Sequence, residues 1–176
     1  MSDERLKKEG SKLVYRGPIA SVRMETFQYP DGSRATRQVV VHPGAVCIIP
    51  HDGGVLYMVE QPREAVEEPA LLELPAGKLD VEGETPLEAA QRELVEEIGK
   101  SAGDWRELKS FYTSPGFANE RVWLFLATEL YDVPNRPSGE ERIEIVEFPL
   151  GEIDRAIARC EDAKSLIGLL LLKELL

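Results

Sequence analysis

The carboxylate-rich stretch at residues 84–99 reads ETPLEAAQRELVEEIG and predicts one short helix. Thr85, Pro86 and Glu88 match a capping box, in which threonine caps the helix, proline takes the first helical position and glutamate folds back from the third. Gly99 readily adopts the left-handed conformation that ends a helix. We therefore expect a helix of about three turns.

Three carboxylates share one side of this helix, because Glu93, Glu96 and Glu97 stand at i, i+3 and i+4. A neighbouring apolar stripe should face a core, and it consists of Leu87, Ala90, Leu94 and Ile98. Like charges at this spacing oppose helix formation by roughly 0.2–0.5 kcal/mol per pair in water. The acidic side therefore needs a source of compensating charge.

Arg92 supplies part of that charge, because Glu88 and Glu96 lie one turn to either side of it. Glu93 and Glu97 have no basic neighbour within the helix by this reasoning. A Glu-rich helix often presents only a solvated acidic face. A divalent cation such as Mg²⁺ or Mn²⁺ would instead relieve the repulsion, since hard cations take carboxylate and carbonyl oxygens and keep waters for a phosphate substrate.

The flanking sequence favours the metal site. The stretch from Glu73 through Gly77 to Gly99 resembles the signature box of the Nudix hydrolases, a glycine followed by the pattern Glu-x7-Arg-Glu-aliphatic-x-Glu-Glu-x-Gly. Two positions depart from the box: six residues instead of five separate Gly77 from Glu84, and Lys100 stands where an aliphatic residue is usual. Both departures lie outside the carboxylate helix.

Three further blocks resemble the ADP-ribose pyrophosphatase branch of that family, also called ADP-sugar diphosphatases. The blocks at residues 60–63 and 71–77 are similar to the branch's Glu-Gln-x-Arg and Leu-Glu-x-Pro-Ala-Gly blocks. Pro115, sixteen residues past Gly99, resembles the branch's marker proline for ADP-ribose. Residues 34–45 end a strand-rich unit that looks like the dimerising appendage of those enzymes.

The resemblance implies Mg²⁺-dependent hydrolysis of ADP-ribose to AMP and ribose 5-phosphate. It implies that Glu93, Glu96, Glu97 and the backbone carbonyl of Ala76 hold two or three ions, while Arg92 orients the helix. The same box would also suit a hydrolase of GDP-mannose or a nucleoside triphosphate. A nucleotide-binding module that lacks catalysis is a more distant alternative.

The remaining site residues are less sharply defined. In this branch a loop glutamate often activates the water, and Glu141 is our first candidate for it and Glu140 the second; two solvated loop acids are the alternative. Arg63 and Arg37 suit a phosphate or the terminal ribose, because a guanidinium binds such groups in a bidentate manner. The predicted substrate-binding set also includes Glu73, Pro115 and Gly116.

Each of these candidates has a simpler interpretation. Pro115 and Gly116 form a dipeptide that is typical of a tight turn, and Arg63 could be an ordinary surface arginine. The order and spacing of these residues around the box favour the functional interpretation.

The pattern of strands and helices predicts an α/β/α sandwich with a mixed sheet over residues 43–176. A small N-terminal antiparallel β unit, residues 1–42, should precede it and form a homodimer, because three short strands bury little by themselves. The expected strands after it are residues 45–49, 55–60, 71–74, 106–112, 122–130 and 142–148. Two closing helices are expected at residues 152–160 and 162–175.

Composition restricts the partners. The chain of 176 residues carries a formal net charge of −11 and has a pI near 4.8, so it has no basic stripe for a nucleic acid or an anionic membrane. No signal peptide is evident in residues 1–11, and the most apolar segment, residues 166–172, is far shorter than the roughly 20 residues that span a bilayer. Cys47 and Cys160 lack metal-ligand spacing and should be reduced thiols. We expect a cytoplasmic enzyme that acts on a small nucleotide sugar.

Overall fold

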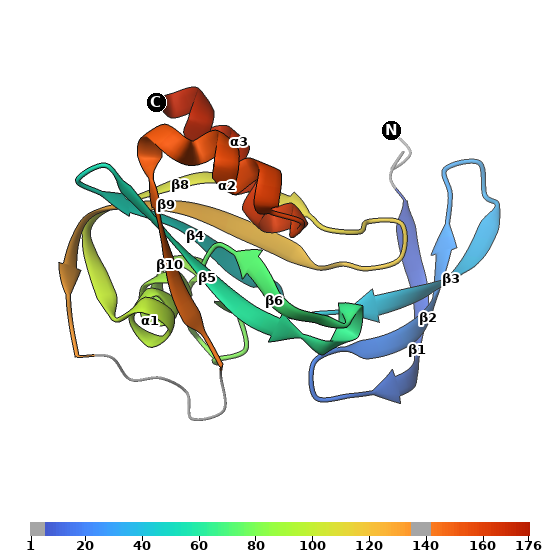
Figure 1. Cartoon of the computed structure of the whole chain (residues 1–176). Coiled ribbons are helices and arrows are strands. Elements are labelled where there is room, and N and C mark those ends of the chain that lie inside the picture. Colours follow the sequence, from blue (N-terminus) through green and yellow to red (C-terminus); the bar gives the residue numbers. More distant parts are fainter. Residues whose placement is uncertain (1–5, 135–141) are drawn as a thin grey trace. The chain divides into compact units, whose positions relative to one another are not determined.

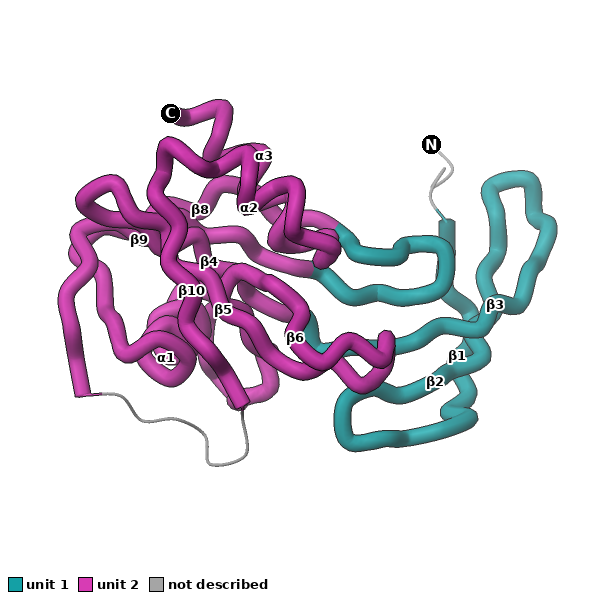
Figure 2. Tube along the Cα trace, viewed as in Figure 1, with its two compact units in different colours: residues 1–44, 112–121 teal, residues 45–111, 122–176 magenta. Residues whose placement is uncertain are grey.

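The computed structural model of the chain describes residues 6–134 and 142–176. The chain divides into two compact units, shown in Figure 2. Unit 1 consists of residues 1–44 and 112–121, and unit 2 consists of residues 45–111 and 122–176. The division adds a second segment, residues 112–121, to the N-terminal β unit.

Unit 1 contains a three-stranded antiparallel sheet in the order β1-β2-β3, formed by Lys7–Arg16, Ser21–Gln28 and Arg34–Val41. The turn between β2 and β3 is closed by Asp31, whose Oδ1 accepts a hydrogen bond from the backbone N–H of Ser33 at 2.9 Å. Gly32 provides the left-handed conformation that this turn needs, at φ 83°. The first strand begins at Lys7, five residues before the strand-like pattern at Lys12.

The second segment of unit 1 is attached to β3 by main-chain hydrogen bonds. Val40 and Ala118 form a parallel bridge, in which Val40 N donates to Phe117 O at 2.8 Å and Asn119 N donates to Val40 O at 3.1 Å. The Asn119 side chain accepts a further bond from the N–H of His42 at 2.9 Å. These contacts explain why residues 112–121 belong to unit 1 although they connect two strands of unit 2.

Unit 2 contains a seven-stranded mixed sheet, in which the order β10-β5-β4-β9-β8 is extended by β6 on β5 and β7 on β4. Strand β4 runs parallel to β9 and antiparallel to β5 and β7. The strands are β4 (Ala45–Asp52), β5 (Val55–Arg63), β6 (Glu68–Glu73), β7 (Ala76–Lys78), β8 (Lys100–Tyr112), β9 (Arg121–Asp132) and β10 (Glu144–Pro149).

Helices cover both faces of this sheet (Figure 1). Helix α1 (Pro86–Ile98) covers one face, and α2 (Ile153–Arg159) and α3 (Ala163–Leu175) cover the other. Alternate residues of β4 belong to the two cores: Cys47 and Ile49 pack with α2 and α3, while Val46 and Ile48 pack with α1. The prediction of an α/β/α sandwich is confirmed.

Three local predictions were wrong. Leu87 is 38% exposed, and the fully buried Ala89 replaces it on the core side of α1. Strand β8 begins at Lys100 instead of Arg106, because its first half is polar and lacks a clear apolar alternation. Strand β7 was missed, since three residues that include Gly77 carry no strand signal.

Both cysteines and part of the last helix are buried. Cys47 and Cys160 are both buried free thiols, and burial raises the pKa of Cys160 to about 11. Leu169 and Leu172 of α3 lie in the core, whereas Leu170 faces outward. Among the described residues, no helix is both long enough and apolar enough to cross a membrane.

Candidate active site

The caps of α1 are as the sequence predicts. The hydroxyl of Thr85 accepts a hydrogen bond from Glu88 N at 3.3 Å, and Thr85 N donates to Glu88 Oε2 at 2.8 Å. At the other end, Gly99 has φ 66° and donates its N–H to Val95 O at 3.0 Å. Both ends of the helix are therefore fixed, and so is the direction of its acidic side.

Arg92 is the centre of charge on that side. Its Nε and Nη2 bind the two carboxylate oxygens of Glu84 at 2.9 and 3.0 Å. Its Nη1 binds Glu93 at 2.7 Å and Glu96 at 3.0 Å. The bidentate contact with Glu84, reinforced by Glu93 and Glu96, raises the pKa of Arg92 above its ordinary value.

This arrangement corrects two expectations. Glu93 does have a basic neighbour within the helix, because the broad guanidinium of Arg92 reaches the adjacent side chain. Glu88 does not pair with Arg92, because its carboxylate is engaged by Thr85 in the capping box. Glu84, in the loop before the helix, is the partner that replaces it.

Strand β7 lies against the acidic side of α1. The N–H of Ala76 donates to Glu97 Oε2 at 3.1 Å. Gly77 approaches Glu93 so closely that a Cβ at Gly77 would lie 1.9 Å from Cδ and 2.0 Å from Oε1 of Glu93. Glu93 and Glu97 are buried, at 8% and 6% exposure. Strand β7 therefore binds the carboxylate of Glu97 through a backbone N–H and packs closely against that of Glu93.

The chemical type of the donor atoms at this site matches the preference of a divalent cation. Glu93, Glu96, Glu97 and the carbonyl of Ala76 offer only oxygen atoms, which Mg²⁺ and Mn²⁺ prefer, and the room beside Gly77 admits the Glu93 carboxylate. In the described part of the chain, however, no three acidic, histidine or cysteine side chains are arranged as a ready metal site. Arg92 contacts Glu93 and Glu96 in this conformation, so the metal-binding role stays a prediction.

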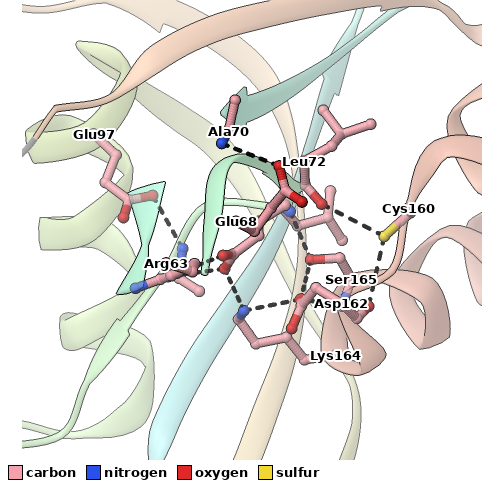
Figure 3. A network of polar contacts seen from close by, with 12 residues as sticks. Arg63, Glu68, Ala70, Leu72, Glu97, Cys160, Asp162, Lys164 and Ser165 are labelled. Carbon is pink, nitrogen blue, oxygen red and sulfur yellow. Dashed lines mark hydrogen bonds and ion pairs between the residues drawn. The ribbon is translucent and has the colours of Figure 1, made fainter. Parts of the chain in front are cut away.

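A second polar cluster surrounds Glu73 at the end of β6. Figure 3 labels its members Arg63, Asp162, Lys164 and Ser165. Arg63 donates from Nε to Glu73 Oε1 at 2.5 Å and from Nη2 to Oε2 at 2.8 Å. Lys164 donates to the same Oε2 at 2.6 Å. Burial by itself would raise the pKa of Glu73, but the bonds from Arg63 and Lys164 outweigh it and hold that pKa below its ordinary value.

The first turn of α3 supports this cluster. Asp162 caps the helix by accepting from Ser165 N at 3.0 Å, and its Oδ2 also accepts from Lys164 at 2.9 Å. Ser165 Oγ accepts from Leu74 N at 2.7 Å, which attaches the helix to the residue after β6. Figure 3 shows these contacts.

Lys164 was not among the predicted site residues. A lysine in the first turn of a helix opposes the helix dipole, which favours acidic residues there. Its position two residues after an Asp cap was therefore a signal that it serves a partner elsewhere. That partner, Glu73, is 91 positions away in the sequence, so periodicity could not identify it.

The other predicted residues lie elsewhere. Arg37, Pro115 and Gly116 belong to unit 1, whereas Arg63, Glu73 and the carboxylates of α1 belong to unit 2. Arg37 is exposed and donates to Thr36 O at 3.1 Å. The segment with Pro115 is a tight turn, in which Phe117 N and Ala118 N both donate to the carbonyl of residue 114 at 3.1 and 2.9 Å. Glu140 and Glu141 lie outside the described residues.

Comparison with known proteins supplies independent information. The NUDIX domain family matches residues 41–167. An ADP-ribose pyrophosphatase of Mycobacterium tuberculosis is 38% identical over 159 residues, which cover 89% of this chain and 76% of that protein. One of Bacillus subtilis is 37% identical over 157 residues, covering 86% and 84%.

Two further matches extend the comparison. A methanol dehydrogenase activator of Bacillus methanolicus is 34% identical over 163 residues, covering 90% of this chain and 87% of that protein. A solved structure of an ADP compounds hydrolase superposes with a TM-score of 0.84 at 24% identity, covering 99% of this chain and 96% of the other. At that identity, the structural match supports the fold.

Proposed function

This chain belongs to the NUDIX domain family, and on that premise we propose that it hydrolyses the pyrophosphate bond of ADP-ribose to AMP and ribose 5-phosphate with the help of Mg²⁺ or Mn²⁺. The observation that carries the proposal is the position of Glu93 and Glu97 against β7. It is supported by the similarity of this chain to two ADP-ribose pyrophosphatases, which extends over most of the length of each.

The proposed chemistry uses the residues already described. Glu93, Glu96, Glu97 and the Ala76 carbonyl would hold the cation, which neutralises pyrophosphate charge and lowers the pKa of a water molecule when bound. Water forms a new bond to one phosphorus, and the bridging oxygen leaves with the other phosphate. Arg92 fixes the carboxylates on the helix, and its charge limits their mutual repulsion.

Proton transfer and substrate binding need further groups. We assign the general base to Glu141, with Glu140 as second choice, on the grounds of the family resemblance. Arg63 is the exposed end of the Glu73 cluster, at 40% side-chain exposure, and would bind a phosphate or ribose oxygen. Arg37, Pro115 and Gly116 of unit 1 are proposed to select the rest of the substrate.

Product analysis tests this function directly. The purified protein is incubated with ADP-ribose, GDP-mannose and a nucleoside triphosphate, each with Mg²⁺ and with a chelator. We expect AMP and ribose 5-phosphate as the main products, and no turnover with chelator. Preferred cleavage of GDP-mannose or a triphosphate would reassign the substrate, whereas binding without turnover would support a regulatory role like the one that the activator's name indicates.

We also propose a homodimer formed through residues 1–42, because β1 to β3 make a small sheet that leaves Leu13, Val14 and Tyr15 exposed. Sedimentation at micromolar concentration should give twice the mass of 19.7 kDa. A fully active monomer would contradict it. The two buried free thiols suit a reducing compartment, so the proposed location is the cytoplasm.

A further inference from the structure

We propose that Lys164 is a positioning residue: through the carboxylate of Glu73 it fixes the guanidinium of Arg63 in the orientation that receives the substrate (Figure 3). This inference rests on the proposed function, in which Arg63 binds a phosphate or ribose oxygen. It adds a residue from the last helix to a site built otherwise from the centre of the chain.

Geometry makes Glu73 the link between the two cations. The Glu73 side chain is 1% exposed, so its carboxylate is bound by protein groups and not by bulk water. One of its oxygens accepts a hydrogen bond from Arg63, while the other is shared between Arg63 at 2.8 Å and Lys164 at 2.6 Å. With Lys164 removed, Arg63 would be the one cation among the described residues that still donates to Glu73, and the carboxylate would lose one of the contacts that fix its rotation.

Exposure assigns different roles to the two cations. The Lys164 side chain is 16% exposed and that of Arg63 is 40% exposed. Arg63 is therefore the member of the cluster that a ligand can reach. Lys164 donates to Asp162 Oδ2 at 2.9 Å, and in this proposal Lys164 acts on the ligand through Glu73.

The charge state of Lys164 is secure. Burial alone would lower the pKa of Lys164, but the neighbouring carboxylates of Asp162 and Glu73 raise it above its ordinary value. The lysine thus remains charged across the pH range in which an assay is made. Ser165 keeps α3 attached to Leu74 by its own hydrogen bond, so that attachment does not depend on Lys164.

Steady-state kinetics on ADP-ribose test the inference with Lys164→Met and, as a second variant that keeps a donor without the charge, Lys164→Gln. Lys173→Met is the matched control, because Lys173 lies on the same helix and pairs with the exposed Asp154. We expect KM to rise roughly tenfold in both Lys164 variants with kcat nearly unchanged, and no change in the control.

A double-mutant cycle separates positioning from general destabilisation. In an Arg63→Ala background, Lys164→Met should raise KM no further, because the group that it orients is already absent. An equal rise in both backgrounds, or an unchanged KM in the Lys164 variants, would overturn the inference.

A measurement that does not depend on turnover tests the role of Lys164 even if the protein does not hydrolyse ADP-ribose. Solvent exchange of the Arg63 Nε–H, followed by NMR, should be faster in Lys164→Met than in the wild type or Lys173→Met. If the wild type fails to hydrolyse ADP-ribose but this exchange responds, then the proposed function is wrong and the positioning contact stands. If exchange does not respond, the positioning role is refuted.

Discussion

The carboxylate of Glu93 occupies the space that a side chain at Gly77 would fill, since a Cβ there would lie 1.9 Å from Cδ of Glu93. The Gly77→Ala substitution should therefore displace the carboxylate and lower kcat roughly a hundredfold, the cost of a misplacement of about 1 Å. Gly151→Ala is the control, because an added Cβ at Gly151 meets nothing within 4 Å. Normal turnover by Gly77→Ala would show that Glu93 is not needed in this position.

The Glu97→Gln substitution tests the charge of the second buried carboxylate. Glutamine keeps an oxygen that can accept the bond from Ala76 N, so the local structure should persist. Turnover with Mg²⁺ should nevertheless fall about a thousandfold or more, because the proposed metal ligand loses its charge. Glu88→Gln, on the same helix but in the capping box, should retain activity. Circular dichroism checks that both variants are folded.

Arg63→Ala has two separable consequences. It removes the proposed charge-assisted contact to the substrate, so kcat/KM for ADP-ribose should fall roughly 10- to 150-fold, mostly through KM. It also leaves the buried Glu73 with Lys164 as its main partner, so the free energy of unfolding should drop by about 1–3 kcal/mol. Urea denaturation measures the second effect. Equal losses on ADP-ribose and on nucleoside triphosphates would mean that Arg63 does not select the substrate.

Acid stability should depend on Glu73. Its ordinary pKa of 4.5 applies to the unfolded chain, while Arg63 and Lys164 lower the pKa in the folded protein. The unfolded state then binds more protons, so the stabilisation is complete above pH 4.5 and is lost as pH falls toward the folded pKa. In Glu73→Gln, the unfolding free energy should vary less steeply with pH in this window. Identical slopes for both proteins would contradict the ion-pair assignment.

The elements that the sequence predicted well are those whose signals are local. The capping box of Thr85 and Glu88 and the stop at Gly99 lie within one helix, so their geometry follows from neighbouring residues. The continuous apolar run at residues 45–49 likewise indicates a strand that is buried on both faces. The order of strands and helices predicted the α/β/α sandwich that these elements form, and the family resemblance implied the same fold.

The errors concern contacts between distant segments. Nothing in the sequence indicates that Arg92 would take Glu84 in place of Glu88, because that choice depends on the path of the preceding loop. The pairing of Lys164 with Glu73 joins the last helix to the end of β6. The role of Glu141 remains a prediction of the family resemblance alone.

The parallel bridge between Val40 and Ala118 has a consequence for biosynthesis. During translation, β1 to β3 leave the ribosome first, but their unit cannot be completed until residues 112–121 have been made. By then, β4 to β8 have also been synthesised, and the late segment connects β8 directly to β9. A truncated protein starting at Ala45 would lack the partner strand for Phe117 and Asn119. Unit 1 therefore consists of two separate chain segments, and a single cut of the chain cannot release it intact.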